Sequence, residues 1–362
     1  MRKKKQKKNK KKKSVFLQKN RLEKMIFWSG GCVVFLVLIL FLNQYFFVNN
    51  YFDFIYKKIP FPVVFVENEG HFEIISSREL SEDFLAVKKF YENIDIKNSG
   101  KRIDFSTKDG RQRLEIIKKD VLNKLVEDAV MEEIAEKRDV VIRQEEVEKA
   151  IESSLSEADG NYKQLILNLK KSYGWDLNDF KKKVVEKQLR MKKVFDWYRN
   201  QLANSSFYRN IQGEVAEVKN GLREFDSLVD ILKSKGDAQV EEVDWLTEQQ
   251  IIPEVLDVLK REKNEKGIAG PIISPLGIHI LKMEGRQIGE NGLKKYKFKQ
   301  IFIRKDNFVE WVDEQKKNSK ILIFSKRYDW SKDRGIIIFR EESMREMEKK
   351  IKLKSQGDPS VW

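Results

Sequence analysis

The feature that most constrains this chain is a run of 24 residues, 25–48, that contains no charged side chain (MIFWSGGCVVFLVLILFLNQYFFV). At about 1.5 Å of rise per residue, a helix of this length covers the roughly 30 Å hydrocarbon core of a bilayer. A helix buried in a protein core does not need so long an uncharged run. The run therefore predicts a single N-terminal transmembrane helix.

The charge before this run predicts its orientation. Residues 1–24 contain thirteen Lys or Arg and one acid, Glu23, so this tail carries +12 of the formal net charge of +15. Basic residues beside a first hydrophobic segment stay in the cytoplasm. We therefore expect a single-pass protein of the cell membrane, with a cytoplasmic N-terminus and extracytoplasmic C-terminal domains. The rest of the chain is nearly balanced in charge, which argues against nucleic acid as a partner.

Two other fates of the N-terminal segment are disfavoured by the residues around it. The exit side, 43–54, has no small-x-small cleavage site, so we expect an uncleaved signal-anchor. Cys32 follows Ser29-Gly30-Gly31, as in a lipoprotein site, but here the apolar run follows the cysteine instead of preceding it. Cys32 is the only cysteine, so the exported part cannot form disulfides and must be stabilised by packing.

The next part of the chain predicts a short hairpin and then helices. Residues 62–75 indicate two strands around a turn, with His71 beside the turn as a surface or half-buried residue. From Ser81, a plausible N-cap, to about residue 204 the pattern is helical. Apolar residues recur at steps of three and four along one long helix, as one helix face requires; they are Leu114, Ile117, Val121, Leu125 and Ala129.

Residues 212–325 predict a compact α+β domain. Strands are expected at 240–246, 267–275, 277–286, 295–303 and 320–325. Helices are expected before the first strand, from Pro253 onward and at 307–318. The fold class is therefore α+β, with a single N-terminal transmembrane helix, a helical module and an antiparallel-sheet domain with flanking helices.

One histidine stands inside a predicted strand of this domain. His279, one of only two histidines, lies in SPLGIHILKMEGR, where Ile278 and Ile280 alternate with it. Together with "VDWL" and "PEVLDVL" before it, the segment "GPIISPLGIHILKMEGR" resembles the second half of a parvulin-type (PpiC-like) peptidyl-prolyl isomerase domain. The segment that begins "IPFPVVFVENEGHFEII" at Ile59, with the helices to Tyr198, is similar to the N-terminal chaperone module of SurA/PrsA-like foldases. The resemblance implies a membrane-anchored foldase.

The sequence departs from the parvulin pattern at the opening strand. That strand carries a histidine in the family, whereas the chain between Trp197 and Val215 has none. A similar strand, 296–303, follows the domain instead, with Gln300 where the histidine would stand. We interpret this as a circular permutation, which predicts that strand 296–303 pairs beside strand 277–284.

The resemblance implies a proline-binding pocket for this domain. Its floor would be formed by His279 and Gln300 as the catalytic pair, and Ile252, Val255 and Gly277 would contact the substrate. Unaided rotation of an X–Pro bond takes tens to hundreds of seconds, so a catalyst only has to stabilise the twisted amide. Gln300 cannot change charge near neutral pH, so we expect weak or lost isomerase activity. A pocket-floor role, an essential catalytic role and a purely structural role remain open for His279.

Other chemistries lack their residues. Two separated histidines and one cysteine exclude a His/Cys-rich zinc site, and no nucleotide-binding or nucleophile-elbow motif is present. We expect no metal and no cofactor. Acidic pairs such as Glu241–Glu242 are expected by chance in a chain so rich in acids.

Two functions remain from the sequence. The first is a membrane-anchored extracytoplasmic foldase or chaperone that binds unfolded or proline-containing exported polypeptides. The alternative is a non-catalytic envelope scaffold or binding protein that retains the parvulin fold. The expected organisation is a basic cytoplasmic tail, a transmembrane helix, a chaperone module, a parvulin-like domain and a C-terminal extension, at residues 1–24, 25–48, 49–211, 212–325 and 326–362.

Overall fold

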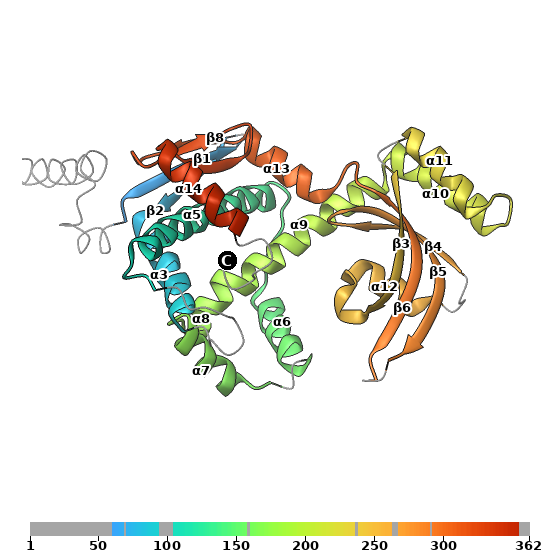
Figure 1. The fold of residues 1–362 in the computed structure, drawn as a ribbon, viewed down its shortest axis with the longest axis horizontal. Helices are drawn as coiled ribbons and strands as arrows, with labels where there is room; N and C mark the ends of the chain where they lie inside the picture. Colours follow the sequence, from blue (N-terminus) through green and yellow to red (C-terminus); the bar gives the residue numbers. More distant parts are fainter. Residues whose placement is uncertain are drawn as a thin grey trace, which may run out of the picture.

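The computed structural model describes residues 60–68, 70–93, 104–157, 160–235, 238–262, 267–289 and 292–354. These residues form two bodies that are joined by a long helix, α9 (Figure 1). We call them the helical body, which contains β1 to α8 and β7 to α14, and the sheet body, which contains α10 to β6. The chain therefore leaves the helical body, builds the sheet body and returns.

The helical body is built around α5, the longest described helix, whose second half is buried on nearly all sides. Its other helices surround α5 and the start of α9 (Figure 1). Side-chain caps fix several starts: Thr107 accepts a hydrogen bond from Gly110 N, and Asp176 forms a reciprocal capping box with Asp179. The helices are α3 (Ser77–Asn93), α5 (Lys108–Glu136), α6 (Gln144–Glu157), α7 (Tyr162–Ser172), α8 (Leu177–Phe180) and α9 (Glu186–Ala203). A π-helical turn, Lys181–Val185, joins α8 to α9.

The N-cap predicted at Ser81 is wrong. Helix α3 begins at Ser77, directly after strand β2, so Ser81 lies inside the helix. The capping hydroxyl is that of Ser76, which accepts a hydrogen bond from Glu79 N at 3.1 Å. The strand runs into the helix without a loop, and this displaces the cap toward the N-terminus.

A three-stranded sheet of the helical body combines two strands from the start of the described chain with one that follows the sheet body. Its strands are β1 (Pro62–Asn68), β2 (His71–Ser76) and β7 (Lys320–Ile323), in the order β2-β1-β7. The predicted hairpin β1–β2 is confirmed. The strand predicted at 320–325 pairs with β1 and not with the strands that follow α11. It does so because Ile321 lies opposite Val66 and completes the apolar core there.

The C-terminal segment packs against α5. Strands β8 (Tyr328–Ser331) and β9 (Ile336–Phe339) form a hairpin, and helix α14 (Glu342–Lys354) follows. The ammonium group of Lys119, on α5, contacts the Glu348 carboxylate of α14 at 2.6 Å, and the Lys119 side chain is only 2% exposed. A buried pair of this kind fixes α14 in one position against α5.

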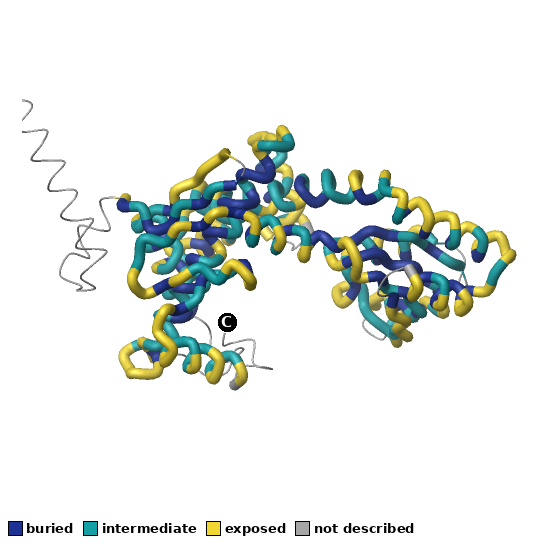
Figure 2. Tube along the Cα trace, turned by 90° about the horizontal axis from the view of Figure 1, so that it is seen from above, coloured by how far each residue is buried: buried dark blue, intermediate teal, exposed yellow. Residues whose placement is uncertain are grey.

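The sheet body is a four-stranded antiparallel sheet in the order β3-β6-β5-β4. Helices α10 (Ser206–Lys219) and α11 (Phe225–Lys235) cover one face, and α12 (Pro253–Arg261) covers the other. The first half of β5 and the second half of β4 are the most buried parts of the sheet, whereas half of β3 is exposed; the buried stretch is dark blue in Figure 2. The strands are β3 (Ala238–Thr247), β4 (Ile268–Ser274), β5 (Gly277–Ile288) and β6 (Lys294–Ile303).

The predicted pairing of strand 296–303 beside strand 277–284 is confirmed. Strand β6 lies between β5 and β3, with Phe302 opposite His279 and Gln300 opposite Leu281. Pro253 occupies the start of α12, as predicted. The hairpin β4–β5 turns at Pro275–Leu276 and places Ser274 opposite Gly277.

Helices α9 and α13 (Phe308–Asn318) connect the two bodies through aromatic contacts. The ring of Phe195 meets that of Phe308 edge to face at 5.3 Å, and Tyr198 contacts Trp311 at 5.2 Å. The Tyr198 hydroxyl donates to the carbonyl oxygen of Asp306 at 2.7 Å. The chain leaves the helical body through α9 and returns to it through α13, and these contacts hold the two helices together.

The α+β class describes the resolved elements, but the predicted fold class has to be corrected in one part. In the ranges that the structure describes, no helix is both long enough and apolar enough to cross a membrane. Even α5, with 29 residues, carries charged side chains along its whole length. Residues 25–48, on which the transmembrane helix was predicted, lie outside the described residues.

Candidate functional site

The predicted site residues His279 and Gln300 lie on the sheet face that α12 covers. Alternation along β5 places His279 on the same face as Leu281 and Met283, which pack with Val255 beneath α12. On β6, Gln300 shares that face with Tyr296 and Phe298. The neighbouring residues Ile278 and Ile280 point to the opposite face and join the core with α10 and α11.

A chain of polar side chains crosses this face from β4 to β3. The Ser274 hydroxyl lies 2.7 Å from Nε2 of His279. Nδ1 of His279 lies 3.3 Å from the Gln300 carbonyl oxygen Oε1. The Gln300 amide nitrogen donates to the Glu241 carboxylate on β3. The polar chain therefore takes one side chain from each strand, in the order β4-β5-β6-β3.

The last member of the polar chain determines the tautomer of His279. An ionised Glu241 only accepts hydrogen bonds, so the amide nitrogen of Gln300 faces it and the amide oxygen faces His279. The imidazole then donates from Nδ1 and accepts the Ser274 hydroxyl proton at Nε2. Burial lowers the pKa of His279, although the hydrogen bond to Gln300 and the charge of Glu241 oppose this shift. At neutral pH His279 is uncharged.

These contacts limit what His279 can do chemically. Its side chain is 4% exposed, its ring packs on Phe302 at 4.9 Å, and both ring nitrogens are engaged. A proton transfer to a bound polypeptide would require one of these hydrogen bonds to break. In this arrangement the imidazole cross-links strands and presents no free nitrogen to a substrate.

The three residues expected to contact a substrate lie around this face. Val255, in the first turn of α12, is 2% exposed and packs into the core beneath the helix. Ile252 is the N-cap residue of α12 and is half-buried. Gly277 begins β5 with a φ of +150°, and a Cβ there would lie 2.3 Å from the carbonyl oxygen of Ile303. The close packing of two strands therefore explains this glycine. The substrate contacts of the three residues remain a prediction.

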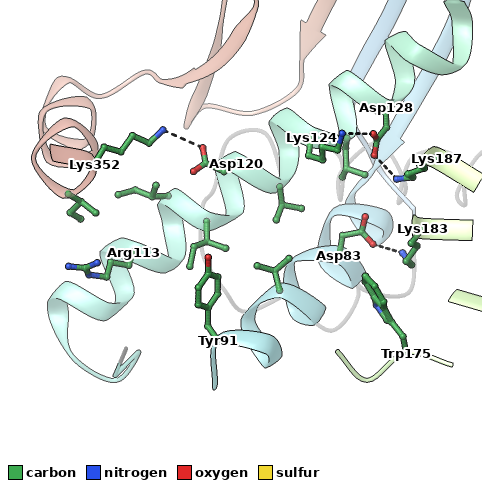
Figure 3. A pocket seen from close by; sticks show the side chains of 16 residues that line it. Asp83, Tyr91, Arg113, Asp120, Lys124, Asp128, Trp175, Lys183, Lys187 and Lys352 are labelled. Carbon is green, nitrogen blue, oxygen red and sulfur yellow. Dashed lines mark hydrogen bonds and ion pairs between the residues drawn. The ribbon is translucent and has the colours of Figure 1, made fainter. Parts of the chain in front are cut away.

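An apolar hollow lies in the helical body, between α3, α5 and α14 (Figure 3). We call it the cradle cavity, and its volume is about 330 Å³. Its apolar lining comes from residues of these helices and from an aromatic side chain that precedes α8: Val87, Tyr91, Ile116, Ile117, Val121, Leu125, Trp175 and Ile351. A hollow of this size admits one or two large side chains or a small ligand.

Ion pairs border the cradle cavity. Asp128 pairs with Lys124 at 3.1 Å and with Lys187 at 2.7 Å, and Asp83 pairs with Lys183. These pairs link α5 to α9 and α3 to the π-helical turn (Figure 3). The charged groups therefore link the helices around an apolar interior and neutralise one another.

A second hollow adjoins the first on the other side of these ion pairs. It has a volume of about 650 Å³ and shares Lys124, Asp128, Lys183 and Lys187 with the cradle cavity. Its wall continues along α9 and α13 and reaches the sheet body at Glu254 and Pro275. We call it the inter-body cleft.

Sequence reasoning did not find these hollows or the role of Glu241. The periodic stripe on α5 predicts an apolar face, but a face that packs and a face that lines a hollow have the same spacing. Glu241 was set aside as part of a chance pair, whereas its position opposite Gln300 places it in the polar chain. Only the register of β3 against β6, which places Glu241 opposite Gln300, shows this role, and the sequence does not specify that register.

In the described ranges, no group of three or more His, Cys, Asp or Glu side chains could hold a metal ion.

No protein-family model matches the chain, and no curated protein sequence matches it. The parvulin and SurA/PrsA resemblance therefore rests on the residues quoted above.

Proposed function

We propose that this chain is a foldase or chaperone that binds unfolded polypeptides, with an isomerase-like domain of weak or lost activity. The observation that carries the proposal is the pair of adjoining hollows, which lead from the helical body to the sheet body. That its clients are exported polypeptides stays a prediction from the sequence.

The shape of these hollows suits an extended chain without a fixed sequence. Burial of one large apolar side chain contributes about 1.5–3 kcal/mol, so two or three such side chains give useful affinity. The charged border of the cradle cavity is neutralised by its own ion pairs and leaves contact with the client to the apolar lining. Binding of this kind depends on apolar content more than on sequence.

The state of His279 supports weak or absent isomerase turnover. A neutral, buried imidazole with both nitrogens bonded offers a client no donor or acceptor. The same observation favours the second candidate, a binding or scaffold protein without catalysis. The two candidates differ in whether the refolding of a proline-limited client becomes faster.

The test uses the full chain in two assays, proline-limited refolding of a reporter and suppression of its aggregation. We expect suppression of aggregation and little or no acceleration of refolding, and we expect His279→Ala to leave the suppression unchanged. His71→Ala, at the only other histidine, is the matched control for the refolding assay alone, because His71 is exposed and lies outside the sheet body. Fast refolding that disappears only in His279→Ala would show an active isomerase, and a chain without effect on aggregation would refute the chaperone function.

A further inference from the structure

Strand β2 is an open edge of the three-stranded sheet. Among the residues that the structure describes, it has β1 on one side and no strand on the other (Figure 1). An edge strand exposes backbone N–H and C=O groups to any chain that can pair with it. Proteins commonly block such edges with lysine, proline or a bulge. The β2 sequence, HFEIIS, contains neither lysine nor proline, and the register shift in the β1–β2 pair lies on β1, between Pro62 and Val64.

The outer face of this sheet carries exposed apolar side chains, which we call the apolar stripe. Phe72 is 65% exposed and Ile74 is 49% exposed on β2. Phe65 of β1 lies directly opposite Ile74 on one side and Leu322 of β7 on the other, and Leu322 is 45% exposed. Phe65 also stacks on Phe72 at 5.7 Å. The stripe therefore crosses all three strands and ends at the open edge.

The opposite face of β2 lies beside acidic side chains. Burial and the charges of Glu132, Glu79 and Glu136 raise the pKa of Glu73. The cations nearby have partners of their own: Arg190 pairs with Glu132 at 3.0 Å, and Lys137 donates to the Asn68 carbonyl oxygen. His71 lies 3.7 Å from Glu136. The inner side of the open edge is therefore acidic, whereas its outer side is apolar.

We propose that β2 binds an extended polypeptide segment as an added strand, and that it selects segments in which apolar and basic residues alternate. Successive side chains of a strand point to opposite faces. In the added strand, one set would extend the apolar stripe beside Phe72 and Ile74, and the other would lie toward Glu73 and Glu136. The inference rests on the proposed function, because it gives the class of client segment that such a chaperone would hold. Main-chain hydrogen bonds supply affinity and alternate side chains supply selectivity.

The test measures binding of short labelled peptides to the full chain by fluorescence anisotropy. The peptides are one with alternating Val and Lys, a shuffled peptide of the same composition, and one with alternating Val and Glu. The protein variants are the double variant Phe72→Lys, Ile74→Lys, and Glu73→Lys. Leu276→Lys is the matched control, because Leu276 is 49% exposed on the β4–β5 turn of the sheet body.

We expect the alternating Val-Lys peptide to bind at least tenfold more tightly than the other two. The double variant and Glu73→Lys should each lose this preference, while Leu276→Lys retains it. Added salt should weaken the Val-Lys peptide more than the shuffled one, and this measurement does not depend on a variant. Equal binding of all three peptides would overturn the inference.

An unfolded reporter chain separates this inference from the proposed function. If the protein binds the unfolded reporter but does not prefer the alternating peptide, the strand-addition site is wrong and the chaperone function stands. If it binds neither, both are wrong. Retained preference in the double variant would also overturn the inference, because both substituted positions lie within the proposed site.

Discussion

The replacement Glu133→Gln should make the protein more stable at alkaline pH. Glu133 lies on α5 and is 3% exposed, and neither carboxylate oxygen has a hydrogen-bond partner among the described residues. Burial raises its pKa from 4.5 to about 7; Glu73, Glu136 and Glu67 add to the rise, and Lys137 opposes it. An ionised carboxylate at this position is therefore unfavourable.

The magnitude follows from the linkage between protonation and folding. Because the folded-state pKa lies above the unfolded one, the protonated carboxyl favours the folded state below about pH 4.5, and this contribution is lost as the pH rises through about 7. One pKa unit is worth about 1.4 kcal/mol. The free energy of unfolding should therefore fall by about 2.5 kcal/mol between pH 5 and pH 8 from this one group.

The assay compares urea unfolding of the wild-type chain and Glu133→Gln at pH 5, 6, 7 and 8, followed by circular dichroism. The glutamine has nearly the same size and cannot ionise, so the two proteins should differ by less than about 1 kcal/mol at pH 5. At pH 8 the variant should be more stable by about 2 kcal/mol. Other carboxyl groups with raised pKa values, such as that of Glu79, act equally in both proteins and cancel in the difference.

The difference between the two proteins as a function of pH is the decisive result. A difference that stays constant from pH 5 to pH 8 would show that Glu133 ionises normally in the folded protein. A variant that is less stable at every pH would show that the carboxyl makes favourable contacts. Either result would refute the reasoning from burial.

Two further substitutions test the packing described above. Gly277→Ala should destabilise the protein by about 2 kcal/mol or more, because the new Cβ would lie 2.3 Å from the Ile303 carbonyl oxygen. Gly213→Ala is the control, because open space surrounds this position, and it should not destabilise the protein. Thermal unfolding measures both variants. Lys119→Met removes the buried partner of Glu348 and should cost about 2 kcal/mol. Hydrogen exchange should then become faster in α14, and unchanged exchange there would contradict the role given to this pair.

The hairpin β4–β5 could be predicted because local signals specify it: period-two alternation on both sides of Pro275–Gly277 defines the two strands. The same alternation predicts β6 as a strand, but its place beside β5 was expected from the parvulin resemblance and is confirmed by the register. The positions of His279 and Gln300 in the sheet do not test the catalytic roles or the substrate contacts that the resemblance implies. These roles and contacts stay predictions.

Other features depend on contacts between distant parts of the chain. The four residues of β7 are too few to specify a partner, and their partner β1 lies more than 250 residues earlier. The cradle cavity arises where α14 meets α3 and α5, so no single helix shows it. The cap at Ser76 was missed because a strand runs directly into α3, a junction that no loop residue marks.

Filling the cradle cavity is the most direct test of the account. Val87 lines the cavity from α3, and Val87→Trp should occupy part of its volume of about 330 Å³. Leu85 on the same helix is 45% exposed, so Leu85→Trp is the matched control. The measurement is the dissociation constant of the full chain for a labelled, permanently unfolded client. The account predicts at least tenfold weaker binding for Val87→Trp and a change below twofold for Leu85→Trp; equal affinity of both variants and the wild-type chain would contradict it.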